Sequence, residues 1–167
     1  WRYVSIITNG WFLTEDRAVN EHIPAERQVQ MLRDLLAPFP DPALQQMREQ
    51  IGPDSQVIYR PLESMLMQRP WFDGRIVLIG DTVHATTPHL ASGACIGIED
   101  GIVLAEELLA GGEVQQALER FQTRRWERCR MVVENSGRLG EIEIQGGDKE
   151  EHARIMRESM MALAQPI

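Results

Sequence analysis

The spacing of apolar residues along the centre of the chain changes abruptly at Gly80. Residues 76–79 form a continuous apolar run, Ile-Val-Leu-Ile, that follows the polar turn at residues 73–75. A short apolar run between turn residues predicts a strand that is buried on both faces. Beyond Gly80 comes a loop, and a helix is predicted to begin at residue 92 or 93.

The apolar residues of that helix recur at helical spacing. Ile98, Ile102, Ala105 and Leu109 are separated by four, three and four residues, so these four are expected to form its buried face. The pair at residues 111–112 is Gly-Gly, and glycine readily takes the left-handed conformation that ends a helix. The sequence therefore predicts a strand, a loop and a helix over residues 76–109.

The start of the chain has the pattern of a small sheet. Residues 1–8 and 11–14 are strand-like and flank Asn9-Gly10, a strong signal for a two-residue hairpin turn. Two more short strands are predicted at residues 57–59 and 65–67.

Two helices are predicted between these strand-like segments. The first lies between Pro24, which a first helical turn tolerates, and Pro38, which stops it. The second follows Asp41 as its N-cap and Pro42 at its first position, and it ends at Gly52-Pro53.

A long helix is predicted over residues 114–144, with apolar positions along one side. Its middle carries several arginines interspersed with glutamates, namely Arg120, Arg124, Arg125, Arg128 and Arg130. Such a mixture is typical of a solvated helix face that is laced with ion pairs four residues apart.

A last helix is predicted after Gly146-Gly147, where Asp148 and Glu151 have the spacing of a capping box. Its apolar stripe consists of Ala153, Met156, Met160 and Leu163. A methionine-bearing stripe of this kind is typical of core or of a dimer contact, so the sequence leaves a homodimer open.

Composition excludes several classes of protein. The 167 residues carry 25 acidic and 17 Lys or Arg side chains, a net charge of −8, which argues against nucleic acid as a partner. No apolar run approaches the roughly 20 residues that span a bilayer, so no membrane partner is expected. Cys95 and Cys129 do not make a disulfide framework, which favours a cytoplasmic location. His84 and His89 lack a third ligand at a sensible spacing, and no metal is predicted.

The strand, loop and helix around Asp81 have the parts of a cofactor site. Ligands of open α/β sheets bind beyond the carboxyl ends of strands, and the free N–H groups of a helix start favour electron-rich atoms. Asp81 would accept hydrogen bonds from hydroxyl groups there. An ordinary strand-loop-helix, in which Asp81 only caps a turn, remains open on these residues alone.

Residues 74–84, GRIVLIGDTVH, resemble the second flavin-binding motif of the FAD-dependent aromatic hydroxylases, the family typified by p-hydroxybenzoate and salicylate hydroxylases. Pro88, Gly93 and the run Glu99-Asp100-Gly101 continue the motif. Thr82-Val83 stands where the family has an Ala-Ala pair.

The resemblance implies a role for particular residues. Asp81 would accept a hydrogen bond from a ribityl hydroxyl of FAD, and the Pro88 carbonyl would lie near the reactive edge of the flavin ring. The N–H groups at the helix start would face the pyrimidine end of the ring, whereas His84 is structural. The implied cofactor-binding residues are Gly80, Asp81, Pro88, Gly93, Ala94 and Cys95. No side chain is implied to be catalytic, because the flavin carries out the chemistry.

The resemblance also implies a fold and a function. The fold is expected to be α/β of a mixed α+β kind. Residues 1–72 would form part of a substrate-binding domain, and residues 73–167 would form the C-terminal part of an FAD-binding domain with long helices. The activity implied is that of a monooxygenase that hydroxylates a small aromatic substrate with FAD, NAD(P)H and O₂. A reductase or dehydrogenase of the same fold, without oxygen insertion, is the alternative.

One motif of such enzymes is absent from the sequence. No G-x-G-x-x-G occurs in the 167 residues, although this motif holds the ADP part of FAD. We therefore expect the chain to be a C-terminal fragment whose N-terminal dinucleotide-binding half is missing. On this interpretation the fragment alone is inactive, and an inert folded piece is a further alternative.

Overall fold

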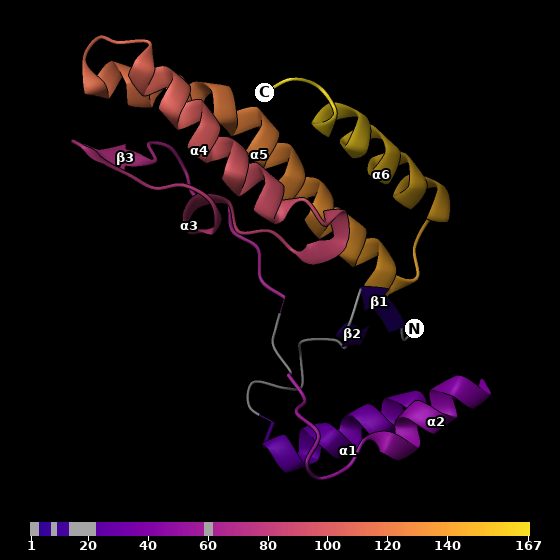
Figure 1. The fold of residues 1–167 in the computed structure, drawn as a ribbon. Coiled ribbons are helices and arrows are strands. Elements are labelled where there is room, and N and C mark those ends of the chain that lie inside the picture. The colour runs from indigo at the N-terminus through magenta and orange to yellow at the C-terminus, as the bar shows by residue number, and fades with distance from the viewer. Residues whose placement is uncertain (1–3, 8–9, 14–22, 59–61) are drawn as a thin grey trace. The chain divides into compact units, whose positions relative to one another are not determined.

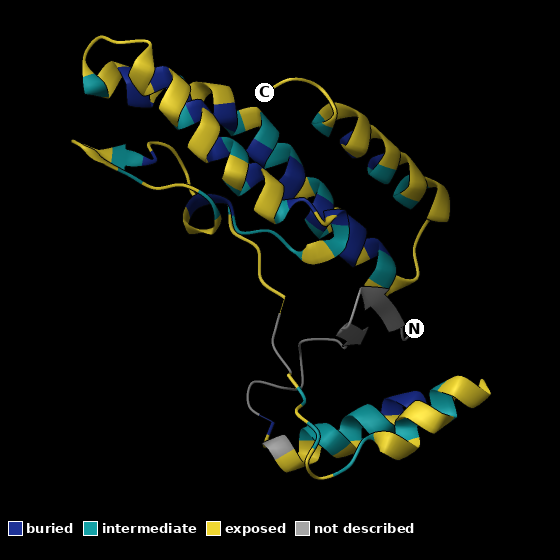
Figure 2. Cartoon of the chain, in the orientation of Figure 1, coloured by how far each residue is buried: buried dark blue, intermediate teal, exposed yellow. Residues whose placement is uncertain are grey.

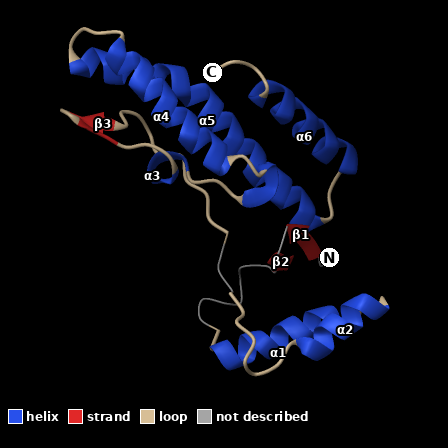
Figure 3. Ribbon diagram, in the orientation of Figure 1, coloured by secondary structure: helices blue, strands red, loops and turns tan. Residues whose placement is uncertain are grey.

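The computed structural model describes residues 4–7, 10–13, 23–58 and 62–167 of the chain. It divides into two compact units, residues 1–61 and 62–167. Figure 1 gives the order of the elements, and Figure 3 shows that helices dominate both units. A mixed fold was predicted, and the structure confirms that helices and strands both occur. No described helix is long and apolar enough to cross a membrane.

The first unit begins with the predicted hairpin. Strands β1 (Val4–Ile7) and β2 (Gly10–Leu13) pair antiparallel, with Ile7 opposite Gly10. Gly10 is therefore a paired strand residue, whereas Asn9 lies outside the described residues. The hairpin prediction is confirmed in these two strands.

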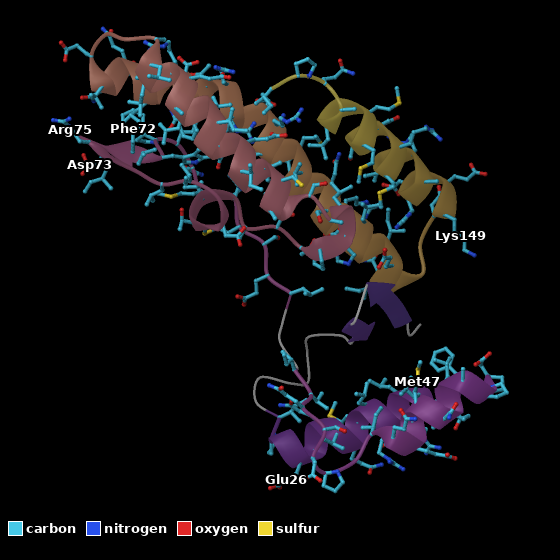
Figure 4. The ribbon with its side chains drawn as sticks, in the orientation of Figure 1. Glu26, Met47, Phe72, Asp73, Arg75 and Lys149 are labelled. Atoms are coloured by element: carbon cyan, nitrogen blue, oxygen red, sulfur yellow. The ribbon has the colours of Figure 1, made fainter. Side chains whose placement is uncertain are left out.

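Two packed helices complete the first unit, α1 (Ala25–Leu36) and α2 (Pro42–Gln50). The predicted N-cap is confirmed, since the Asp41 carboxylate accepts the Ala43 N–H at 2.9 Å. The Arg48 Nε donates to the carbonyl of Arg33 at 2.9 Å and ties the second helix to the first. Figure 4 marks Glu26 on α1 and Met47 on α2, and both of these side chains are exposed.

Neither of the two later short strands forms as predicted. Residues 57 and 58 are not in a strand, and Tyr59 lies outside the described residues. Residues 65–67 are also not a strand, although the Met65 and Met67 N–H groups donate to the carbonyls of Ala85 and Val83 at 2.9 and 2.7 Å. The acceptors belong to a helical turn and its end, so the pairing does not extend into a sheet.

The strands of the second unit form a minimal hairpin of β3 (Phe72–Asp73) and β4 (Ile76–Val77). Its tip turns at Gly74, which has a φ of 56°, and Figure 4 labels Asp73 and Arg75 on either side of this glycine. The one-turn helix α3 (Asp81–His84) and the 3₁₀ helix η2 (Pro88–Leu90) follow.

The predicted strand at residues 76–79, buried on both faces, is wrong. Only Ile76 and Val77 are in a strand, and the Ile76 side chain is 72% exposed. Burial on both faces requires a neighbouring strand on each side and a covering layer on each face. Among the described residues β4 pairs with β3 alone, so the apolar run has too few neighbours to be buried.

Three long helices form the bulk of the second unit, and their predicted positions are confirmed. They are α4 (Gly93–Leu109), α5 (Val114–Gln145) and α6 (Lys149–Leu163). Figure 1 shows α4 and α6 running alongside α5. Gly111 and Gly146 have the positive φ expected after a helix end, at 81° and 63°. The Asp148 carboxylate accepts the Glu150 N–H at 2.7 Å, as predicted for an N-cap.

The apolar stripe predicted for α6 is correct at two of its four positions, since Met156 and Leu163 are partly buried against an apolar cluster. Ala153 and Met160 are exposed, and the fully buried positions are Ile155 and Ser159. Glu151 does not close a capping box with Asp148. Its carboxylate instead binds the guanidinium of Arg138 on α5 at 2.9 Å, an interhelical contact that local sequence spacing does not predict.

Two apolar clusters hold the second unit together, and Figure 2 shows buried positions along both α4 and α5. One cluster contains Leu90, Ile96, Val132, Leu139, Ile142 and Ile155. The other contains Trp71, Val83, Val103, Phe121 and Cys129. Helix α5 contributes residues to both clusters, so it is the central element of the unit.

Candidate cofactor half-site

The buried face of α4 is not the one predicted from its apolar residues. Ile98, Ile102 and Leu109 are 66%, 48% and 86% exposed, and Ala105 is exposed as well. The buried positions of the helix are instead Ile96, Asp100, Val103 and Glu107. Two of these are acidic, so their burial requires charged or polar partners.

Asp100 is the centre of a buried polar network. Its Oδ2 accepts the backbone N–H of Gly80 at 2.8 Å and lies 2.6 Å from the Nε2 of His84. Its Oδ1 accepts the Nε of Arg125 at 2.7 Å. The side chains of Asp100, His84 and Arg125 are all fully buried. One carboxylate thus joins the end of the β4 segment, α3 and α5.

Arg125 places a full positive charge between the helices. Its remaining guanidinium nitrogens donate to Glu99 at 2.8 Å and to the carbonyl of Ile96 at 3.0 Å. The prediction that the arginines of α5 form a solvated face is therefore wrong for Arg125. It is correct for Arg130, which pairs on the surface with glutamates on its own helix.

The other arginines also bind across helices. Arg120 and Arg124 each contact the Glu107 carboxylate at 2.7 Å. Arg128 contacts Glu99 at 2.7 Å and donates to the last carbonyls of α6. These pairings explain why acidic residues occupy the buried face of α4.

The network shifts the pKa values of its members in opposite directions. Burial opposes ionisation of Asp100, but hydrogen bonds from His84, Gly80 and Arg125 outweigh it and hold its pKa below the usual range. Burial likewise opposes charge on His84, but contacts with Asp100 and Cys129 outweigh it and raise its pKa to about 10. Both shifts favour the charged form of the group concerned, so that Asp100 and His84 compensate each other.

The network does not suit a metal ion. Ligand atoms of His84, Asp100 and Cys129 lie within 4.8 Å of one another. The guanidinium of Arg125, however, lies 2.7 Å from Asp100 and 3.7 Å from the Cys129 sulfur, so it already supplies the positive charge. His89 is held by Thr87 at 2.9 Å and by a longer contact with Glu143, and neither partner belongs to this cluster.

Gly80 brings the turn before Asp81 directly onto α4. It has a φ of 63°, a conformation that favours glycine, and a Cβ on Gly97 would lie 3.7 Å from its Cα. Asp81 then begins α3 with an exposed side chain. The neighbouring Thr82 hydroxyl donates to the carbonyl of Ile79 at 2.7 Å, so it serves the turn itself.

The start of α4 presents unsatisfied backbone donors. Ser92 precedes the helix, but its hydroxyl donates to the Leu90 carbonyl at 2.8 Å and caps no N–H group. Within the described residues, the N–H groups of Gly93, Ala94 and Cys95 meet no acceptor. Such donors, together with the helix dipole, favour an electron-rich or anionic ligand atom.

The loop between α3 and α4 is anchored on α5. The Ser136 hydroxyl lies 2.6 Å from the Thr87 carbonyl and accepts the Leu90 N–H at 3.3 Å, which holds η2 on both sides of Pro88. Pro88 itself is exposed, and its carbonyl accepts the Ala91 N–H at 2.8 Å.

The residues present fit a flavin cofactor. An exposed carboxylate, Asp81, follows a glycine turn that is fixed on α4, and the same helix begins with free N–H groups. A Cβ on Gly93 would lie 2.9 Å from the Thr86 methyl, so a side chain at this helix start would crowd the loop. The structure relates all six predicted residues to α4. The helix begins with Gly93, Ala94 and Cys95, and its Asp100 binds the N–H of Gly80. Asp81 and Pro88 lie in the segments between Gly80 and the helix.

The sequence analysis named Asp100 only as part of the flavin motif and Arg125 only as part of a solvated helix face, and it predicted a buried role for neither. The signal was nevertheless present. Arg125 lies four residues after Phe121 and four before Cys129, within the apolar stripe of α5. Asp100 lies four residues after Ile96, so both charges occupy positions of core spacing.

The central part of the chain matches a known protein family. Residues 54–136 match the family described as FAD binding domain. The chain is 40% identical over 90 residues to YetM of Bacillus subtilis (strain 168), whose name gives FAD-dependent monooxygenase as a provisional activity. That match covers 54% of this chain and 24% of YetM.

Two further relatives carry names that specify a reaction. Aurachin C monooxygenase/isomerase of Stigmatella aurantiaca is 38% identical over 90 residues, which cover 54% of this chain and 24% of that protein. 3-Hydroxybenzoate 6-hydroxylase of Polaromonas naphthalenivorans (strain CJ2) is 38% identical over 73 residues, covering 43% and 18%. The matches thus span a quarter or less of these relatives. No solved structure matches the chain.

Proposed function

We propose that the chain supplies one half of the flavin site of a monooxygenase. The premise is that it belongs to the family of FAD-binding, aromatic-hydroxylase-like flavoproteins. The observation that carries the proposal is the Gly80–Asp81 turn bound to α4, whose own first turn has free N–H groups. The proposal concerns the whole protein, since the matches cover a small part of each relative.

The residues of the chain bind and orient the cofactor. The exposed Asp81 carboxylate accepts a hydrogen bond from a ribityl hydroxyl, a role assigned by the resemblance. The N–H groups of Gly93, Ala94 and Cys95, at the positive end of the α4 dipole, stabilise negative charge on the ring. The loop at Pro88, anchored through Ser136, would lie near the reactive edge of the ring, as the resemblance implies, and there it would limit access of water.

The overall reaction follows from the cofactor chemistry. FAD, when bound, transfers electrons from NAD(P)H to O₂, so that one oxygen atom enters the substrate and the other leaves as water. The balanced change is an aromatic C–H bond plus O₂, NAD(P)H and a proton going to a phenol, NAD(P)⁺ and water. A small aromatic substrate is proposed because one relative is named a hydroxybenzoate hydroxylase. Residues 1–72 are proposed to belong to the substrate-binding domain.

The decisive experiment supplies the whole protein with NAD(P)H, a panel of phenolic and related aromatic acids, and ¹⁸O₂. The proposal expects a hydroxylated product that carries one labelled oxygen atom. Oxidation of NAD(P)H with no labelled product for any substrate would favour the reductase or dehydrogenase of the same fold.

Asp81 provides a test of the site itself. Replacing Asp81 by Ala in the whole protein removes one hydrogen bond to the cofactor, which costs roughly 0.5–3 kcal/mol. The Kd for FAD should therefore rise by about twofold to a hundredfold. Asp73→Ala is the matched control, since this exposed carboxylate lies at the β3–β4 hairpin (Figure 4). An unchanged Kd in Asp81→Ala would remove Asp81 from the site.

The chain alone is proposed to bind FAD weakly, because it has no G-x-G-x-x-G motif to hold the ADP part. Gel filtration of the purified chain with FAD should separate the two. A stoichiometric flavin absorption spectrum in the protein fraction would contradict this.

A further inference from the structure

We propose that Asp100 is a positioning residue for cofactor binding. From the buried face of α4 it fixes the backbone on both sides of Asp81, and so keeps the Asp81 carboxylate in a constant position relative to the free N–H groups of Gly93–Cys95. The inference rests on the proposed function, because it concerns the same flavin half-site.

Asp100 contacts residues on both sides of Asp81 in the sequence. The Gly80 N–H, which Asp100 accepts at 2.8 Å, belongs to the residue directly before Asp81. His84, whose Nε2 lies 2.6 Å from the same carboxylate oxygen, ends the helix that Asp81 begins. Asp81 itself remains exposed. Its backbone is therefore held from two directions while its carboxylate stays available to a ligand.

The same face of α4 connects Asp100 to the helix start. Gly93, Gly97 and Asp100 follow one another at intervals of four and three residues, which places them on one side of the helix. Gly97 is the point of closest approach, since a Cβ there would meet the Cα of Gly80 at 3.7 Å. The helix thus carries the free N–H groups in its first turn, and it contacts the Gly80–Asp81 turn through Gly97 and Asp100, one and two turns later.

Arg125 holds the carboxylate in place from the opposite side. It donates to Asp100 Oδ1 at 2.7 Å, which leaves Oδ2 for Gly80 and His84. A group that is fixed in this way gives a preorganised site, because less freedom remains to be lost when the ligand binds.

Glu107 offers a matched control on the same helix. It also lies on the buried face of α4 and also pairs with arginines of α5, Arg120 and Arg124, at 2.7 Å. Within the part of the chain that the structure describes, no hydrogen bond of Glu107 reaches the Gly80–Asp81 turn. Glu107→Gln therefore removes a comparable charge pairing without touching the cofactor half-site.

The experiment titrates the flavin-free whole protein with FAD and follows the quenching of flavin fluorescence, while thermal unfolding of the same samples reports stability. We expect Asp100→Asn to raise the Kd for FAD by about tenfold or more, and Glu107→Gln to change it by less than about twofold. Both variants should have a lower Tm. An unchanged Kd in Asp100→Asn, or an equal rise in Glu107→Gln, would overturn the inference.

A second pair of variants covers the case in which Asp100→Asn does not fold. His84→Leu removes one contact of Asp100 and leaves Gly80 and Arg125 in place, so we expect a rise in Kd of about threefold to tenfold. His84→Gln, whose amide nitrogen can reach the position of Nε2, should restore the Kd to within about twofold. Equal affinities in His84→Leu and wild type would overturn the inference.

The two proposals fail in different ways. If the wild-type protein does not bind FAD, the proposed function falls and takes this inference with it. If the wild type binds FAD and Asp100→Asn binds it equally well, only the positioning role of Asp100 is lost.

Discussion

The two faces of α4 partly reverse the usual distribution of charge and hydrophobicity. The face against α5 contains Asp100 and Glu107, each paired with arginine, whereas Ile98, Ile102 and Leu109 lie on the exposed side. In a typical surface helix the apolar stripe faces the core and the charges face water. Here the partner helix decides the orientation.

The reversal follows from what α5 presents to α4. Arg125 occupies a core position of α5, and a buried arginine needs carboxylates and carbonyls around it. Rotating α4 to bury Ile98 and Ile102 would take Asp100 away from Arg125 and leave the guanidinium uncompensated. A cost of several kcal/mol for an unpaired buried charge exceeds the gain from covering two isoleucines partly exposed at a helix surface. The same orientation puts Asp100 against Gly80.

The largest expected effect comes from breaking the charged face. Arg125→Met should lower the free energy of unfolding by about 3–5 kcal/mol, because Asp100 remains buried without its guanidinium partner. The measurement is urea unfolding of the chain, followed by far-UV circular dichroism.

Arg130→Met is the control for that change. Arg130 pairs with Glu127 and Glu134 on the exposed side of the same helix, and exposed pairs contribute less than about 1 kcal/mol. A loss below about 1 kcal/mol in Arg125→Met as well would mean that the buried pair does not determine the orientation of α4.

A second effect is expected from pH, through His84. The folded chain raises the pKa of His84 from 6.5 to about 10, so its pairing with Asp100 stabilises fully below pH 6.5 and is lost as pH rises toward 10. Asp100 keeps Arg125 and Gly80 as partners after His84 has lost its proton. The difference in unfolding free energy between wild type and His84→Gln, measured by urea unfolding from pH 6 to 10, should shrink with rising pH.

His89 gives the opposite sign and serves as a control. Burial lowers its pKa in the folded chain despite the nearby Glu143, so its titration removes stability as pH falls below 6.5. The difference in unfolding free energy between wild type and His89→Gln should therefore change as pH falls below 6.5. A pH dependence of the same sign for both histidines would contradict the assignment of His84 as charged.

Local signals in the sequence were sufficient to place the helices. The Asp41 cap, the glycines after α4 and α5 and the Asp148 cap all act within a few residues, so their effect is visible in the sequence itself. The flavin motif at residues 74–84 is equally local, and residues 54–136 match the FAD-binding family that it indicates.

Tertiary contacts could not be predicted in the same way. The burial of residues 76–79 depends on strands and layers beside them, and the described residues supply β3 alone as a paired strand. The buried face of α4 depends on Arg125, which lies 25 residues further along the chain. Counting apolar residues on α4 alone favours the wrong face, since the deciding charge belongs to another helix.

The smallest expected effect lies on the apolar face of α4, and two adjacent residues isolate it. Ile102 is 48% exposed, whereas Val103 is fully buried in the apolar cluster that also contains Trp71 and Phe121. Ile102→Ala should change the free energy of unfolding of the chain by less than about 0.5 kcal/mol, because little buried surface is lost and alanine favours the helix. Val103→Ala removes two buried methyl groups and should cost about 2 kcal/mol. Urea unfolding of both variants under one set of conditions gives the comparison. If Ile102→Ala costs as much as Val103→Ala, then α4 buries its apolar stripe in solution, and the pairing of Asp100 with Arg125 cannot be what orients the helix.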